Sequence, residues 1–167
     1  MATIHPLPAH LSPALTRREA ITDAITRFLV GLDTSNKSLF ESAFTSTTTL
    51  TINGNTIEGL DAIITGCYDV IGKLDTTHFL TNVRINVDEG GRKAGVTASA
   101  LSQHYRAGEG LVGGKEALLV GSLYWVEVVR DEDEGDKEGE GEFWRIQHFT
   151  LKSTWAEGEW GVLKASN

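Results

Sequence analysis

Two residues of this sequence, Asp33 and His78, have the types and positions from which acid–base chemistry can be built. Asp33 continues an apolar stripe of four-residue spacing, which is formed by Ile21, Ile25 and Leu29 and therefore lies on one helix face. His78 stands in "DTTHFLTNVRINVD", just before alternating residues typical of a strand. A carboxylate that accepts the Nδ1 hydrogen of an imidazole fixes its tautomer, which leaves Nε2 as a general base. The sequence therefore predicts a dyad of these two residues.

Each residue also has a simpler explanation. Asp33 opens the segment "DTSN", which is rich in capping residues, so its alternative role is to end one helix and cap the next. A single histidine near a strand is more often structural than catalytic. Both alternatives remain open at this point.

Further candidates for a pocket lie on the later strands. Residues of one parity from Ala94 to His104 are mostly small, which would leave room for a ligand in front of His104; the alternative is an exposed histidine at a strand end. His148 shares parity with Trp144 and Ile146, so it could line the pocket, or it could be a core histidine with its hydrogen bonds satisfied. Tyr124 offers a hydroxyl group, and Arg145 offers a cation for a developing anion or for the solvent-facing surface.

The elements that must position these residues can be read from the patterns. "TRRE" at residues 16–19 predicts the capping box of a first helix, and shorter helices are expected at 36–44 and 59–71. "TTTLTINGNTIEG" predicts a strand, a turn at Asn53-Gly54 and a short returning strand. Long strands are expected near 80–88, 93–106, 117–130 and 142–155. Helices followed by strands indicate an α+β fold, with a strongly curved antiparallel or mixed sheet wrapped around the N-terminal helices as a cone-shaped roll with a pocket.

Length and composition limit the function. The 167 residues suit a single domain at 15–167 after a flexible arm at 1–14. The net charge is −8, of which residues 131–142 carry −7, because this run holds eight acids and one lysine; we expect it to be a solvated, mobile loop. No basic stripe supports nucleic-acid binding, and no run approaches the ~20 apolar residues of a membrane span. One cysteine and no metal-ligand spacing favour a cytoplasmic protein without cofactor or metal.

The segments "FLVGLDTSNKSLFESAF", "DTTHFLTNVRINVD" and "FWRIQHFTLKSTW" resemble the SnoaL-like family, within the superfamily of nuclear transport factor-like cones. Hexachlorocyclohexane dehydrochlorinase, scytalone dehydratase and bile acid dehydratase are similar in the first two places. The likeness runs over about residues 15 to 160. It implies that Asp33 and His78 are the catalytic pair and that His104 matches a second histidine of scytalone dehydratase.

The sequence departs from the dehydratases in one respect. Their pocket uses a tyrosine from the first helix, whereas residues 15–33 contain none, and Phe28 cannot donate a hydrogen bond. The sequence thus predicts a cofactor-independent lyase, isomerase or cyclase, of the polyketide cyclase kind, acting on an apolar small molecule such as a secondary metabolite. The alternatives are a ligand- or partner-binding cone without catalysis, and an epoxide-opening hydrolase of the same fold.

The last two predicted strands carry large apolar residues on both parities, among them Trp125, Trp144 and Trp155. A sheet whose outer face met only water would alternate between apolar and polar residues. We therefore expect a homodimer or homotrimer through the outer face of the sheet, as in relatives of the resembled family. The alternative is that the N-terminal arm or the C-terminal segment covers that face.

Overall fold

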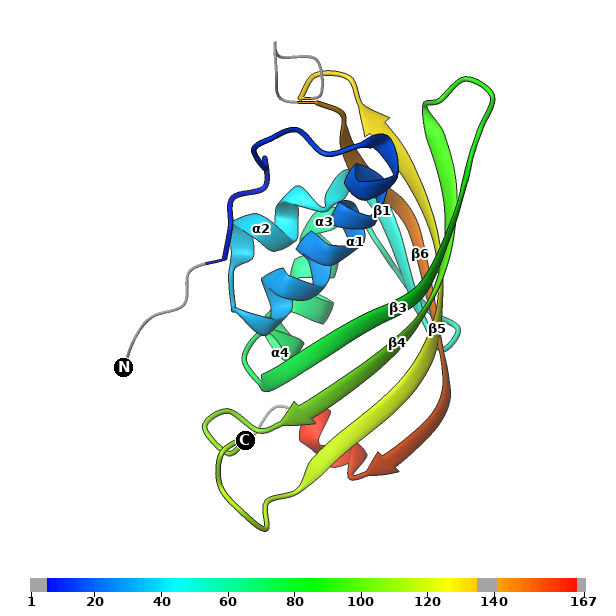
Figure 1. Ribbon diagram of the computed structural model, residues 1–167. Helices are drawn as coiled ribbons and strands as arrows, with labels where there is room; N and C mark the ends of the chain where they lie inside the picture. The colour runs from blue at the N-terminus through cyan, green and yellow to red at the C-terminus, as the bar shows by residue number, and fades with distance from the viewer. Residues whose placement is uncertain (1–5, 135–140, 165–167) are drawn as a thin grey trace.

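The computed structural model describes residues 6–134 and 141–164, so half of the acidic run and the first five residues of the predicted arm lie outside the described residues. Helices lie on the concave side of a curved six-stranded sheet (Figure 1), as an α+β cone requires. The helical segments are α1 (Arg17–Asp33), α2 (Lys37–Ser42), α3 (Leu60–Ile63), the π-helical turn η1 (Ile64–Tyr68), α4 (Asp69–Ile71) and the 3-10 turn η2 (Trp160–Leu163). The strands are β1 (Phe44–Ile52), β2 (Asn55–Glu58), β3 (Asp75–Val87), β4 (Lys93–Tyr105), β5 (Ala117–Asp131) and β6 (Phe143–Gly158).

The sheet is mixed, in the order β2-β1-β6-β5-β4-β3, and its only parallel pair within the described residues is β1 with β6. The predicted fold class is therefore confirmed. No helix in the described part of the chain is long and apolar enough to cross a membrane.

Helix α1 begins with the predicted capping box. The backbone N–H and the hydroxyl of Thr16 both donate to the Glu19 carboxylate, at 2.8 and 2.7 Å. The stripe of Ile21, Ile25 and Leu29 is buried against the sheet, which brings the next residue on that face, Asp33, to the side of β3.

A β-bulge in β3 decides which way His78 points. The strand begins at Asp75, earlier than predicted, so His78 lies inside it. Between Thr81 and Arg84 the strand holds one residue more than β4 opposite, and Asn82 takes a left-handed conformation with φ of 53°. The extra residue reverses the parity of the strand. His78 and Ile85 therefore both face the helices, although they are an odd number of residues apart.

A second bulge, at Gln147 in β6, has the opposite effect, because it turns the side chain of His148 away from the helices. Ile146 pairs with Val128, yet His148 pairs with Glu127, so the strand gains one residue between them. The side chain of His148 is 47% exposed on the outer face, with Nδ1 2.7 Å from the Thr49 hydroxyl. The prediction that His148 lies beside Trp144 and Ile146 is wrong in both its pocket and its core form, because parity was counted through the bulge.

The two ends of the acidic run are held by ion pairs. Asp131 accepts a hydrogen bond from Arg145, and Glu142 is bound by Arg17 at 2.6 Å. These ends belong to the packed part of the hairpin, whereas we expected the whole run to be solvated.

The outer face of the sheet carries a group of exposed apolar side chains, which we call the outer patch: Phe79, Leu123, Trp125 and Trp155. Trp125 is 66% exposed. The ring of Trp155 lies over Gly121, where a Cβ atom would come within 2.2 Å of it. Segment η2 packs instead on Leu118 and Val120, which face the concave side, so it does not cover the outer patch.

We propose that a second copy of the chain covers the outer patch, since an apolar surface of this kind favours association. Light scattering at micromolar concentration should give a mass above the 18.1 kDa of the monomer. Trp125→Glu should shift the protein to the monomer, because it places a charge inside the contact. Leu111→Glu is the matched control, since Leu111 is exposed but lies in the loop after β4. A monomeric wild-type protein would refute the proposal.

Candidate functional site

The cone encloses a cavity of about 120 Å³ between α1, the segments that follow β2, and the concave face of the sheet. Apolar side chains from the helices form one part of its wall, namely Phe28, Leu29, Leu32, Cys67 and Ile71. The strands contribute polar side chains, namely His78, Ser102, His104, Ser122 and Tyr124, and Asn53 and Ser153 also line the cavity. The predicted pocket residues Phe28, His78, His104 and Tyr124 thus come together in one cavity.

The Asp33 carboxylate holds His78 from behind the cavity wall. Its Oδ1 atom lies 2.6 Å from Nδ1 of His78 and accepts a hydrogen bond from the Thr76 hydroxyl at 2.7 Å. Its Oδ2 atom accepts the backbone N–H of His78 at 2.8 Å. Because a carboxylate can only accept, the hydrogen of the imidazole lies on Nδ1, and Nε2 carries a lone pair in the neutral ring.

The place of β3 at the edge of the sheet explains why Asp33 binds there. β3 pairs only with β4 among the described strands, so backbone groups along its other side need partners. Asp33 supplies one from the last residue of α1. The alternative role for Asp33, capping the next helix, belongs instead to Asn36, whose Oδ1 accepts the N–H of Leu39 at 3.0 Å.

The ionisation of Asp33 follows from competing effects. Burial raises the pKa of the carboxyl group, but the hydrogen bonds and charge of His78, together with the Thr76 hydroxyl, outweigh burial and hold the pKa below its ordinary value. Asp33 is therefore a carboxylate at neutral pH, which suits it to stabilise a positively charged His78.

His104 is the second imidazole of the cavity and differs from His78 in its electrostatics. It is 5% exposed, which excludes the alternative of an exposed strand-end histidine. Its Nδ1–H donates to the Leu118 carbonyl at 3.3 Å, and its ring stands edge to face with that of His78 at 5.4 Å between centroids. Burial and the neighbouring His78 lower the pKa of His104 to about 4, so its ring is neutral at pH 7.

Arg145 does not reach the cavity. Its Nε donates to Asp131 and its Nη1 to the Ser42 carbonyl at 2.9 Å, so the guanidinium joins the β5–β6 end to the last residue of α2. The prediction that it stabilises an anion in the pocket is not supported by this position. Ser122, by contrast, was missed as a candidate. The sequence could have indicated Ser122, since this small polar residue lies two positions before Tyr124 and therefore on the same face of the strand.

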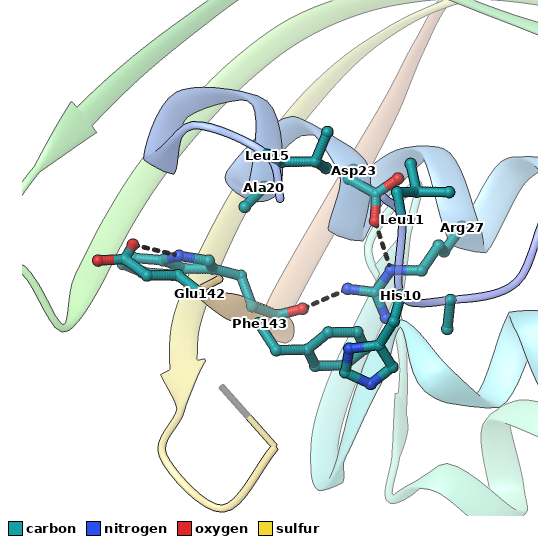
Figure 2. Close-up of a pocket in the computed structure, with 10 residues that line it drawn as sticks. His10, Leu11, Leu15, Ala20, Asp23, Arg27, Glu142 and Phe143 are labelled. Carbon is teal, nitrogen blue, oxygen red and sulfur yellow. Dashed lines mark hydrogen bonds and ion pairs between the residues drawn. The ribbon is translucent and has the colours of Figure 1, made fainter. Parts of the chain in front are cut away.

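A second, much smaller hollow of about 20 Å³ lies under the N-terminal arm (Figure 2). Arg27 fills one side of it and is held by Asp23 at 2.8 Å and by the Trp144 carbonyl at 2.5 Å. The guanidinium stands 4.0 Å from the centre of the Phe143 ring, against which His10 of the arm stacks. The size and the fully engaged Arg27 mark this hollow as a packing feature that fixes the arm.

No group of three side chains suited to hold a metal ion occurs within residues 6–134 and 141–164. The chemistry of the cavity, as far as those residues define it, rests on imidazole, carboxylate and hydroxyl groups.

Comparison with known proteins agrees with the fold. The model of the SnoaL-like domain matches residues 13–150. "Terrestric acid biosynthesis cluster protein E" of Penicillium crustosum is 50% identical over 156 residues, which cover 93% of this chain and 95% of that protein. Two solved structures share the fold. One is a type 2 hexachlorocyclohexane dehydrochlorinase, with a TM-score of 0.66 and 21% identity over 89% of this chain and 93% of that one. The other is a candidate scytalone dehydratase of Novosphingobium aromaticivorans, with a TM-score of 0.67 and 19% identity over 85% of this chain and 87% of that one. The chain therefore belongs to the SnoaL-like family.

Proposed function

We propose that this protein is a cofactor-independent enzyme that removes a proton from a small, mostly apolar molecule, with His78 as the general base and Asp33 as its partner. The observation that carries the proposal is the 2.6 Å contact between Asp33 and Nδ1 of His78, in a pair whose histidine lines a cavity. This contact leaves Nε2 as the basic atom of the pair.

The steps follow from this arrangement. A C–H bond of the substrate breaks as its proton moves to Nε2 of His78, and the Asp33 carboxylate stabilises the imidazolium that forms. The released electron pair either forms a double bond and expels a leaving group, which makes a lyase, or enters a neighbouring unsaturated group, which makes an isomerase or cyclase. The apolar wall of Phe28, Leu29 and Leu32 keeps water away from this step.

The kind of substrate is suggested by the relative in Penicillium crustosum, whose name places it in a biosynthetic cluster. Its identity of 50% along nearly the whole chain supports a secondary-metabolite intermediate as the substrate here. The dehydrochlorinase and dehydratase structures support the fold alone.

The two alternatives are less consistent with the cavity. An epoxide-opening hydrolase needs a water molecule held by several polar groups beside a carboxylate, but the described cavity wall holds no acidic side chain, since Asp33 stands behind His78. A binding cone without catalysis would have no need for a carboxylate that orients an imidazole toward its ligand.

The base can be tested with 2-indanone, a small ketone whose C–H bonds next to the carbonyl exchange with deuterium. Wild-type protein should accelerate this exchange in D2O, measured by proton NMR. His78→Gln should lower the protein-catalysed rate by ~10²–10⁴, the usual effect of losing a general base. Asp33→Asn should also be severe, because an amide can favour the wrong tautomer.

His148→Gln is the matched control for this experiment, because it changes a histidine on the outer face. It should leave the exchange rate unchanged. Exchange no faster than in buffer, or exchange at wild-type rates in both dyad variants, would count against His78 as the base.

The neutral state of His104 makes a prediction about stability. In the unfolded chain this ring takes up a proton near pH 6.5, but in the folded protein only near pH 4, so protons favour the unfolded state between these values. The contribution of His104 is complete above pH 6.5 and is lost as the pH falls. His104→Gln should remove up to roughly 3 kcal/mol of the fall in unfolding free energy between pH 6.5 and 4.

Urea unfolding of the wild-type protein and of His104→Gln at several pH values measures this effect, because Asp33 and the other titrating groups are present in both proteins and their contributions cancel in the difference. An equal pH dependence in wild type and His104→Gln would show that His104 is not held neutral by burial.

A further inference from the structure

The hydroxyl group of Thr76 donates to the same carboxylate oxygen that receives the ring of His78. Oδ1 of Asp33 lies 2.7 Å from the Thr76 hydroxyl and 2.6 Å from Nδ1 of His78, while Oδ2 accepts the backbone N–H of His78 at 2.8 Å. A carboxylate oxygen has two lone pairs, so these two donors fill Oδ1. The oxygen that faces the base is therefore shared between the ring and one hydroxyl group.

Strand β3 holds this hydroxyl in a fixed place. Thr76 and His78 are two residues apart and precede the bulge, so both side chains lie on the inner face, where Asp33 binds them. Thr76 pairs with His104 on β4, and His78 pairs with Ser102. The branched side chain of a threonine has few χ1 rotamers. The donor is thus as rigid as the strand that carries it.

The Asp33 carboxylate needs such a donor because it is open on one side. Its side chain is 18% exposed and lines, together with Thr76 and Asp75, an open hollow outside the cavity. The torsion that rotates a carboxylate has broad minima, so its own rotamers do not fix the two oxygens. The Thr76 hydroxyl restricts this rotation and keeps Oδ1 toward Nδ1 of His78.

The same hydroxyl changes the electrostatics of the pair. Burial raises the pKa of Asp33, whereas the ring and backbone of His78 and the Thr76 hydroxyl lower it. A donor that stabilises the charge of the carboxylate also weakens its attraction for the proton on the ring. Thr76 thereby limits how strongly the pair holds a proton.

The titratable groups around the pair bring no charge of their own at neutral pH. Burial lowers the pKa of His104 to about 4, and burial raises the pKa of Cys67 to about 12. Burial also raises the pKa of Tyr124. Asp75 lines the hollow, where its Oδ2 atom accepts the N–H of Gly110 at 2.8 Å, so it is held by the loop after β4.

We propose that Thr76 is a positioning residue of the base, whose hydroxyl aims the Asp33 carboxylate at His78 and sets how readily the ring holds a proton. This inference rests on the proposed function and deepens it. The working unit is a row of three side chains, Thr76, Asp33 and His78, of which His78 lines the cavity. The hydroxyl keeps its hydrogen throughout the reaction.

Thr76→Val tests the proposal, because it puts a methyl group where the hydroxyl was and leaves no room for water in its place. In the deuterium exchange of 2-indanone, the acid limb of the pH–rate profile should move to higher pH by up to about one unit, since Oδ1 then attracts the ring proton more strongly. The maximal rate should fall about tenfold, the usual worth of a hydrogen bond to a charged group. KM should stay the same, because Thr76 does not line the cavity.

Three further variants complete the experiment. Thr76→Ser keeps the hydroxyl and should restore both the profile and the rate. Thr76→Ala should shift the acid limb in the same direction but by less, because water from the hollow can replace the hydroxyl, and it covers the case in which Thr76→Val fails to fold. Thr77→Val is the matched control, since this exposed neighbour points to the other face of β3, and it should leave the profile unchanged.

Nitrogen NMR of the His78 ring follows its protonation without any substrate and so separates this inference from the proposed function. The midpoint of the titration should rise in Thr76→Val and Thr76→Ala and return to the wild-type value in Thr76→Ser. An unchanged midpoint in both hydroxyl-free variants, or the same shift in Thr77→Val, would overturn the positioning role. A shifted midpoint in a protein whose wild type shows no exchange would support the role of Thr76 and contradict the base.

Discussion

The carboxylate of Asp33 is the contact on which both the architecture and the chemistry of this protein depend. It receives three hydrogen bonds from β3, from the Thr76 hydroxyl, the His78 backbone and the His78 ring. The first two attach the end of α1 to an edge strand that would otherwise present unpaired groups. The third sets the tautomer of the imidazole. Stability and reactivity are thus coupled in one side chain, because its partners cannot be satisfied unless helix and strand are both in place.

The cavity divides its electrostatics between two histidines that lie close together. His78 has a carboxylate behind it, whereas His104 is held only by a backbone carbonyl and stays neutral. Two imidazoles with the same environment would repel each other once protonated. The difference in their partners separates their roles, so that one ring suits proton transfer and the other is a neutral ring that donates to the backbone.

Much of this arrangement could be predicted from the sequence where the local pattern is regular. The four-residue spacing in α1 placed Asp33, and β4 runs without a bulge, so counting parity put Ala94 to His104 correctly on the inner face. The pairing of Asp33 with His78 came from residue chemistry and from a family resemblance. Parity failed for His148 in β6, where Gln147 adds a residue to one strand only, and counting it from His78 through β3 would also fail, because Asn82 does the same there. Such bulges depend on pairing between distant strands, which a single strand's sequence does not encode. The sequence places Tyr124 and Ser122 on one parity, but it does not show that their hydroxyl groups line a cavity, since serine on an inward parity is usually bonded within the protein.

The bulge at Asn82 also bears on how this chain can change by mutation. It keeps His78 on the same side as the apolar residues of the second half of β3, although simple alternation would separate them. Loss of the single codon for residue 82 would restore alternation and turn either the imidazole or the apolar stripe outward. One deletion in the gene, without any substitution in the cavity, would then convert a chain with an inward base into a cone without one.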